Sequence, residues 1–323
     1  RLIMANYKDI HGTKIETVTS DPSNPVVGQV WYNSTDKVLK GFISSPAGSW
    51  ATSNALNTAR TALGAAGIQT AALAFAGEAP PGAQALTESY NGTSWTELAD
   101  MNTARVDVGS AGLTNTAALV FGGSSPAKDE TETWNGTSWT EVGDLNTGRS
   151  FLAGAGTNTS ALAFGGTPPV TDKTESWNGS AWTEVADLNQ QRRQLGSAGV
   201  SNTSALAFGG RNAPPDSQGV VESWDGSSWT EVADLNTARN YLGGFGTQTA
   251  ALAFGGVPSG TGATEEWNGS GWTEVADLNT ARRSLGGAGT TSAGLAFGGT
   301  PPVTGATEEW NAPTETTKEF DAS

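Results

Sequence analysis

The sequence predicts an all-β fold, a β-propeller of six blades with four antiparallel strands in each blade. The phrase Leu-Asn-Thr-Ala-Arg, or a close variant, recurs six times at intervals of 43–47 residues. Phe-Gly-Gly recurs with the same period, and so does an aromatic residue followed by Asn-Gly-x-x-Trp. A period of about 44 residues is typical of propeller blades. No stretch of useful length has helical periodicity.

One repeat predicts four short strands, which we call A to D in chain order. In the last repeat, strand A (285–289) is rich in small residues, and strand B (293–297) is hydrophobic and ends at a Gly-Gly pair. After a Pro-containing loop, strand C covers 306–310. In the other repeats Asn-Gly then predicts a tight two-residue hairpin. Strand D follows this turn, as in 272–275.

Both ends of the repeat array predict how the ring closes. The last repeat stops after Trp310-Asn311 and lacks strand D. The missing Trp-containing strand stands before the first repeat, around Trp50. We therefore expect this N-terminal strand to complete the sixth blade, because an open ring would leave sheet edges unpaired.

Three segments are predicted along the chain. Residues 1–47 precede the repeats and contain a hairpin, with strands at Val27–Tyr32 and Val38–Phe42. Residues 48–312 form the propeller. Residues 313–323 are polar and are expected to form a tail or a docking strand.

Composition excludes several kinds of site. The chain has no Cys and a single His, His11, so disulfides, thiolate nucleophiles and Cys or imidazole metal sites are excluded. The formal net charge of −15 disfavours nucleic-acid binding. No apolar run approaches 18 residues, so no membrane insertion is predicted. We predict no catalytic residue, no cofactor and no metal.

Residues that recur in every repeat are expected to hold the blades together. Aromatic pairs such as Trp134 and Trp139 would pack one blade on the next. An arginine in each repeat is expected to pair with a glutamate; the arginines are Arg60, Arg105, Arg149, Arg192, Arg239 and Arg282, and the glutamates are Glu88, Glu132, Glu175, Glu222, Glu265 and Glu308. The alternative is a ring of arginines that captures an anion at the channel mouth.

The repeats differ mainly in two connections, D to A and B to C. Antiparallel strands place both on one side of the propeller, here called the variable face. Variable loops on a rigid scaffold are suited to binding. The candidate ligand- or partner-binding residues are Asp107, Phe151, Arg193, Gln194, Tyr241, Arg211, Asn212 and Asp216. Phe151 and Tyr241 would suit sugar stacking, whereas the alternative is that these are neutral solvent loops.

Taken together, the repeated motifs over residues 48–312 resemble the Kelch repeat. The N-terminal run Gly28-Gln29-Val30-Trp31-Tyr32-Asn33 resembles short modules of tailed-phage fibre and other virion proteins. These resemblances imply a virion component, as a fibre, head-fibre or tail-associated protein. Residues 1–47 would attach to other virion proteins, and the variable face would bind a host-surface glycan or protein.

We therefore expect a non-catalytic virion protein that assembles in the bacterial host cytoplasm, which suits a chain without Cys. Two alternatives stay open. One is a carbohydrate-active propeller enzyme that uses a carboxylate pair. The other is a bacterial Kelch-type adaptor, which keeps the binding role in another setting. The sequence leaves the oligomeric state open, including a homo-oligomer.

Overall fold

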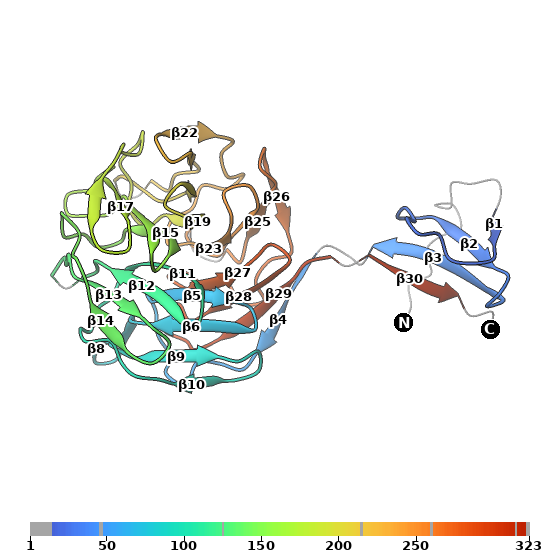
Figure 1. The fold of residues 1–323 in the computed structure, drawn as a ribbon, viewed down its shortest axis with the longest axis horizontal. Coiled ribbons are helices and arrows are strands. Elements are labelled where there is room, and N and C mark those ends of the chain that lie inside the picture. The colour runs from blue at the N-terminus through green and yellow to red at the C-terminus, as the bar shows by residue number, and fades with distance from the viewer. Residues whose placement is uncertain are drawn as a thin grey trace. The chain divides into compact units, whose positions relative to one another are not determined.

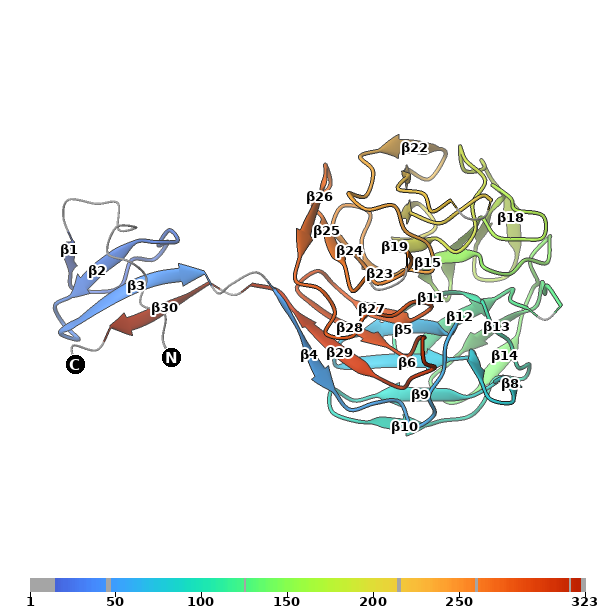
Figure 2. The same cartoon turned by 180° about the vertical axis from the view of Figure 1, so that it is seen from behind.

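The computed structural model describes residues 15–44, 48–124, 126–213, 216–258, 261–313 and 315–320. His11 and the rest of residues 1–14 of the expected attachment segment lie outside this part. The chain divides into two compact units, Ser49–Asn311 and a smaller unit of Arg1–Gly48 with Ala312–Ser323 (Figures 1 and 2). Every regular element in the described ranges is a β-strand. No helix long and apolar enough to cross a membrane occurs among them.

The larger unit contains six sheets of four antiparallel strands, in the A to D order expected of one repeat. The A strands are β5 (Gly64–Ile68), β11 (Gly109–Thr114), β15 (Ala153–Thr157), β19 (Gly196–Ser201), β23 (Gly243–Gly246) and β27 (Gly286–Gly289). The B strands are β6 (Ala71–Phe75), β12 (Ala117–Phe121), β16 (Ser160–Phe164), β20 (Ser204–Phe208), β24 (Ala251–Phe254) and β28 (Ala293–Phe297). The C strands are β9 (Thr87–Tyr90), β13 (Thr131–Trp134), β17 (Thr174–Trp177), β21 (Val221–Trp224), β25 (Thr264–Trp267) and β29 (Thr307–Asn311). The D strands are β10 (Trp95–Glu97), β14 (Trp139–Glu141), β18 (Trp182–Glu184), β22 (Trp229–Val232), β26 (Trp272–Val275) and β4 (Ser49–Ser53).

The expectation of repeated four-stranded antiparallel sheets in an all-β chain is confirmed, but the number of sheets is not. The described residues form eight sheets, where the sequence predicted six and a hairpin. One additional sheet is a short pairing of β7 (Glu78–Ala79) with β8 (Gly82–Ala83) inside the first B to C connection. The other belongs to the smaller unit, where strands from both chain ends pair.

The last four-stranded sheet takes its D strand from the beginning of the unit. β4 pairs antiparallel with β29, and Trp50 lies opposite Trp310. Their ring centroids are 5.5 Å apart. The A strand of this sheet, β27, lies beside β5 of the first sheet. Trp95 of the first sheet donates its indole N–H to Thr307 Oγ1 of the last sheet at 3.1 Å.

Neighbouring sheets pack through one recurring set of side chains. The B-strand phenylalanine of one sheet contacts the D-strand tryptophan of the next, as in Phe121 and Trp182 with centroids 4.8 Å apart. In the second sheet the A strand has glycine beside this phenylalanine, and a Cβ on Gly109 would lie 2.3 Å from the Phe121 ring. The packing role expected for the tryptophan pairs is confirmed by their burial.

Each repeated arginine forms the expected pair with a glutamate of strand C. Arg105 Nη2 lies 2.7 Å from Glu132 Oε1, and Arg105 Nη1 donates to two backbone carbonyls. Glu132 Oε2 accepts from the backbone N–H of Asn102. All six arginines and all six glutamates are at most 2 % exposed. The alternative expectation, an arginine ring at the channel mouth, is therefore wrong for these residues.

The turn between strands C and D differs from the expected two-residue hairpin. Trp134 pairs with Trp139, so four residues connect the strands. The Asn135 side-chain oxygen accepts from the backbone N–H groups of Thr137 and Ser138, both at 2.9 Å. Gly136 follows with φ of +93°, which favours glycine. Asn-Gly thus begins a four-residue turn that the Asn side chain caps, and the prediction of a two-residue turn is wrong.

The smaller unit has the sheet order β1-β2-β3-β30. β1 (Glu16–Val18) is parallel to β2 (Val30–Asn33), and β3 (Val38–Ser44) pairs antiparallel with both β2 and β30 (Glu315–Phe320). The expected hairpin is therefore present with shifted strand ends. Residues 315–320 belong to the segment expected as a tail or a docking strand, and they supply a strand of this unit.

Asp21 organises the polar centre of the smaller unit. Its carboxylate accepts from Trp31 Nε1 at 3.0 Å and from Asn33 Nδ2 at 2.9 Å. Lys40 Nζ lies 3.0 Å from the second oxygen. These hydrogen bonds, the one from Trp31 foremost, lower the pKa of Asp21 to about 2. Hydrogen bonds to Asp36 and Asp21 raise the pKa of Lys40.

Candidate binding site on the variable face

One residue in each repeat of the variable face has a left-handed backbone conformation. It follows the buried arginine by two positions and has φ between 53° and 59°. These six residues are Ala62, Asp107, Phe151, Gln194, Tyr241 and Ser284. Side chains are uncommon in this region of φ/ψ space, where glycine carries no steric cost. The chain has 43 glycines, yet it places none at these positions.

Backbone hydrogen bonds connect these six residues in a cycle. Each donates its N–H to the carbonyl of the equivalent residue in the preceding repeat, over 2.8–3.1 Å. Tyr241, for example, donates to Gln194 at 2.9 Å. The first residue, Ala62, donates to the last, Ser284, at 2.8 Å. The cycle fixes all six backbones around a common centre, so their side chains define one mouth.

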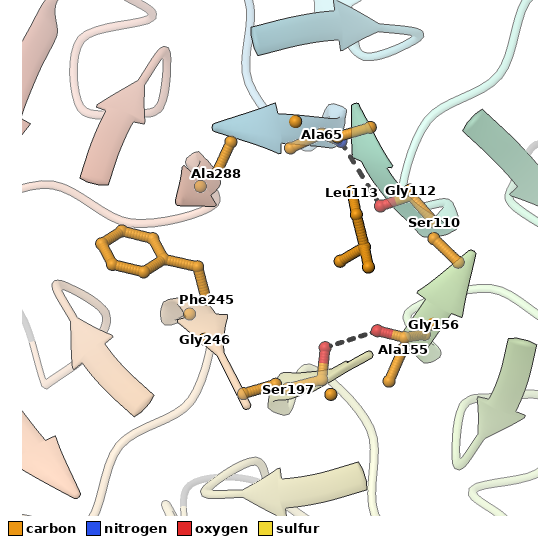
Figure 3. Close-up of a pocket in the computed structure, with 18 of the residues that line it drawn as sticks. Ala65, Ser110, Gly112, Leu113, Ala155, Gly156, Ser197, Phe245, Gly246 and Ala288 are labelled. Carbon is orange, nitrogen blue, oxygen red and sulfur yellow. Dashed lines mark hydrogen bonds between the residues drawn. The ribbon is translucent and has the colours of Figure 1, made fainter. Parts of the chain in front are cut away.

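This mouth is a cavity of about 100 Å³, lined by the six left-handed residues and by the leucine or valine that follows each of them. Deeper layers are lined by the small residues of the A strands. Figure 3 shows the opposite end, where Leu113 points into the opening and Phe245 turns toward the Ala288 side. Ser197 there donates to the Gly154 carbonyl at 2.7 Å. Chemically distinctive side chains are therefore concentrated at the mouth.

Two aromatic side chains meet at the mouth. Phe151 and Tyr241 have ring centroids 6.0 Å apart in an edge-to-face arrangement of 82°. Two arginines flank the second ring: the guanidinium carbons of Arg211 and Arg283 each lie 5.7 Å from the Tyr241 centroid. Cations at this distance are attracted to the ring. Arg211 comes from the fourth sheet's B to C connection, and Arg283 precedes the sixth sheet.

The structure brings together most of the residues expected from the sequence. Asp107, Phe151, Gln194 and Tyr241 line the cavity. Arg193 and Arg211 pair through their backbones, with both N–H···O distances 2.9 Å. Asn212 and Asp216, by contrast, are exposed and are not among the cavity-lining residues.

Three residues of the mouth were not among the candidates. Ala62 and Ser284 complete the cavity lining, and Arg283 lies against Tyr241. Equivalence of position in the repeat would have found the first two, since each stands two residues after a buried arginine. Arg283 directly follows a buried arginine, as the candidate Arg193 does, so its position in the repeat would have found it too.

Asp107 is the acidic group of the mouth. Burial raises the pKa of Asp107 to about 6, and the negative charge of Glu78 acts in the same direction. Ser124 donates a hydrogen bond to its Oδ2 at 2.9 Å, which opposes the shift. A carboxyl group with such a pKa changes charge in the mildly acidic range and can donate as well as accept a hydrogen bond. Across the described ranges, no group of three or more His, Cys, Asp or Glu could hold a metal ion.

Comparisons with known proteins concern the fold. No protein-family model and no curated protein matches this chain. Among solved structures 467 chains match, and one is described as "Structure of YjhT". It aligns with a TM-score of 0.66 and 12 % sequence identity, over 81 % of this chain and 99 % of that one. At this identity the likeness concerns the fold alone. Together with the repeated four-stranded sheets, it supports a β-propeller fold.

Proposed function

We propose that this chain is a non-catalytic binding protein of a phage virion, and that its variable face binds a host-surface glycan. In this proposal the six four-stranded sheets are the blades of one closed, Kelch-like propeller. Support comes from the hydrogen-bond cycle at the mouth and from the packing of β27 beside β5. A rigid ring of this kind holds loop residues in fixed positions, which lowers the entropic cost of binding.

The main observation in favour of a binding role is that the side chain varies at the left-handed positions while the arginine before them does not. Six chemically different side chains stand on one backbone conformation, while the arginine two residues before each is constant. Backbone strain of this kind costs on the order of 1–3 kcal/mol per residue and is concentrated at functional sites. Phe151 and Tyr241 supply aromatic surface, and Asp107 with Gln194 supplies polar groups. This combination suits a sugar, which has both apolar faces and hydroxyl groups.

The proposed setting on a virion rests on the smaller unit. Its β2 contains Val30-Trp31-Tyr32-Asn33, within the segment that resembles phage fibre modules. The unit is compact by itself and has its own polar centre at Asp21. We assign it the attachment to other virion proteins. Detection of the chain in purified particles by mass spectrometry tests this setting, and its presence only in the free fraction of the lysate would favour the adaptor alternative.

Glycan binding is tested with a glycan array and two mouth variants, Phe151→Ala and Tyr241→Ala. Alanine fits the left-handed backbone, because Ala62 already occupies an equivalent position. Loss of an aromatic contact worth about 0.5–1.5 kcal/mol would weaken binding by about two- to twelvefold. Val200→Ala is the matched control, since Val200 is an exposed apolar residue at the other end of an A strand. Equal binding by both mouth variants and wild type would remove the proposal.

The second candidate, a carbohydrate-active enzyme, is favoured by one observation. Asp107 lies at the cavity mouth, and its pKa of about 6 is suited to a general acid. Our proposal expects wild type to leave bound oligosaccharides intact. Chromatography of the products measures hydrolysis. Hydrolysis by wild type that is abolished in Asp107→Asn would establish the enzyme instead.

A further inference from the structure

We propose that Arg211, Arg283 and Tyr241 form an anion-binding site at the mouth, which takes a glycan that carries a negative charge. The inference rests on the proposed glycan-binding function and names the chemical class of its ligand. The site lies where the fourth, fifth and sixth repeats meet on the variable face.

The first argument is that three described arginines form no salt bridge with a described acidic residue. Six of the described arginines are buried in pairs with glutamates. The other three are Arg193, Arg211 and Arg283, and none of them forms a salt bridge with a described residue. The protein has a net charge of −15, so acidic groups are abundant elsewhere. Unpaired arginines that gather beside one cavity are therefore positioned for an external anion.

The second argument is how these arginines are held. Tyr241 receives Arg211 and Arg283 from two different repeats, both 5.7 Å from its ring centroid. Contact with an aromatic ring orients a guanidinium and leaves its N–H groups free to bind. Arg193 stands beside Arg211 through their backbone pairing.

An independent observation comes from Gln194. Its side chain lines the cavity and is only 5 % exposed. Its Oε1 has no hydrogen-bond donor in the described part of the chain. A buried acceptor without a donor costs about 1–3 kcal/mol. A ligand hydroxyl group would satisfy this acceptor, which favours a sugar over a simple inorganic anion.

The mouth also has two electrically different sides. Asp107 belongs to the D to A connection that precedes the second sheet, Glu78 belongs to the B to C connection of the first, and the charge of Glu78 helps to raise the pKa of Asp107. Arg193, Arg211 and Arg283 stand on the side of the fourth to sixth repeats. A ligand with its negative group toward the arginines and hydroxyl groups toward Asp107 would be bound in one orientation. This polarity argues for a charged sugar rather than a uniformly acidic peptide.

Titration calorimetry on the full chain tests the site with four probes: trigalacturonate, a sugar phosphate, the neutral galactose trisaccharide and hexaglutamate. We expect at least one charged sugar to bind at least about tenfold more tightly than the neutral one. The preferred charged sugar then distinguishes a carboxylate from a phosphate.

Binding of the neutral sugar alone overturns the anion site and leaves the proposed glycan binding intact. Failure of all three sugars overturns the proposed function itself, and tighter binding of hexaglutamate overturns the glycan assignment.

Two variants locate the site. Arg211→Gln and Arg283→Gln should each weaken the charged sugar about tenfold or more and leave the neutral sugar unaffected. Lys128→Gln is the matched control, because Lys128 lies in the second B to C connection of the same face and pairs with Glu130. Thermal unfolding shows that each variant is folded. An unchanged affinity in both arginine variants would refute the assignment.

Discussion

The interior between neighbouring sheets uses the same residues in repeat after repeat, whereas the mouth uses six different residues on one backbone conformation. In the interior, Arg105 pairs with Glu132 and with two backbone carbonyls, and glycine stands beside the Phe121 ring. At the mouth, side chains occupy positions where glycine would be relaxed, and the Gln194 side-chain oxygen has no donor among the residues that the structure describes. The difference teaches that the residues that stabilise the fold and the residues suited to binding occupy separate positions, only a few residues apart in each repeat. Substitutions in the interior should therefore destabilise, and some at the mouth should stabilise.

The largest effect is expected from Glu132→Ala in the interior. It leaves the buried Arg105 guanidinium without its carboxylate, which costs about 3–5 kcal/mol. Chemical denaturation measures the loss in unfolding free energy. Glu141→Ala is the control, because Glu141 lies opposite Glu132 in the sheet but is exposed. Similar losses in the two variants would show that the pair has no special role.

Gly294→Ala tests the fit between neighbouring sheets. The fifth repeat has Phe245 where the third has Ala155, and a Cβ on Gly294 would lie 2.0 Å from the Phe245 ring. Overpacking of this kind costs about 1–3 kcal/mol. In a Phe245→Ala background the same substitution should be nearly neutral. A double-mutant cycle of unfolding free energies measures this coupling, and additive losses would contradict it.

Asp107→Asn should stabilise the protein in a pH-dependent way. In the unfolded chain this carboxyl ionises near pH 3.8, but in the fold only near pH 6, since burial raises its pKa. The folded state is therefore penalised as pH rises from about 4 to about 6, and the penalty persists at higher pH. Removing it should raise the unfolding free energy by on the order of 2 kcal/mol at neutral pH and little at pH 4. Thermal unfolding at both pH values checks this, and an equal gain at both would argue against the raised pKa.

Ser284→Gly should stabilise the mouth by about 0.5–1 kcal/mol. Ser284 has φ of +53°, and glycine removes the strain at some cost in unfolded-state entropy. The reverse change in the adjacent interior, Gly286→Ala, should destabilise, because its Cβ would meet the Phe297 ring at 2.6 Å. Melting temperatures of the two variants compare the regions directly. A lower melting temperature for Ser284→Gly would show that its side chain supports the fold.

Val221→Thr is expected to give a small gain inside the otherwise constant interior. In five interfaces the D-strand indole donates to a threonine of the neighbouring sheet, as Trp139 does to Thr87 at 2.9 Å. Trp272 faces Val221 instead, and its buried Nε1 has no partner among the described residues. A threonine would supply the acceptor and add about 0.5–1.5 kcal/mol. Thr87→Val is the mirror control and should lose a similar amount.

The sequence predicted the strands of the larger unit well, because the same strand pattern recurs at equivalent positions of every repeat. It also predicted that the strand around Trp50 would pair with the one that ends at Asn311, since that repeat visibly lacks its last strand. It left open whether residues 313–323 form a tail or a docking strand, because these mostly polar residues show no apolar alternation. It gave the wrong turn length at Asn135, because the side-chain cap is not visible as a spacing. These failures concern contacts that only the folded chain creates.

For the candidate site, the useful signal was a position whose residue differs between repeats while the neighbouring residues of the repeat stay the same. It found Asp107, Phe151, Gln194 and Tyr241, which the structure gathers at one cavity. Small side chains were passed over, so Ser284 was missed. Loop length was a poor guide, since Asn212 is exposed away from the cavity lining. The position of a residue within its repeat decides whether its side chain lines the cavity, and its residue type alone does not.

The pairing of β3 with β30 has a consequence for cleavage by proteases. The chain passes between its two units twice, once after β3 and once before β30. A single nick after β3 leaves the larger unit covalently joined to β30, and a nick before β30 leaves it joined to β1–β3. Releasing the larger unit therefore takes two cuts and not one. A chain without cysteine obtains in this way the redundancy that a disulfide would otherwise provide.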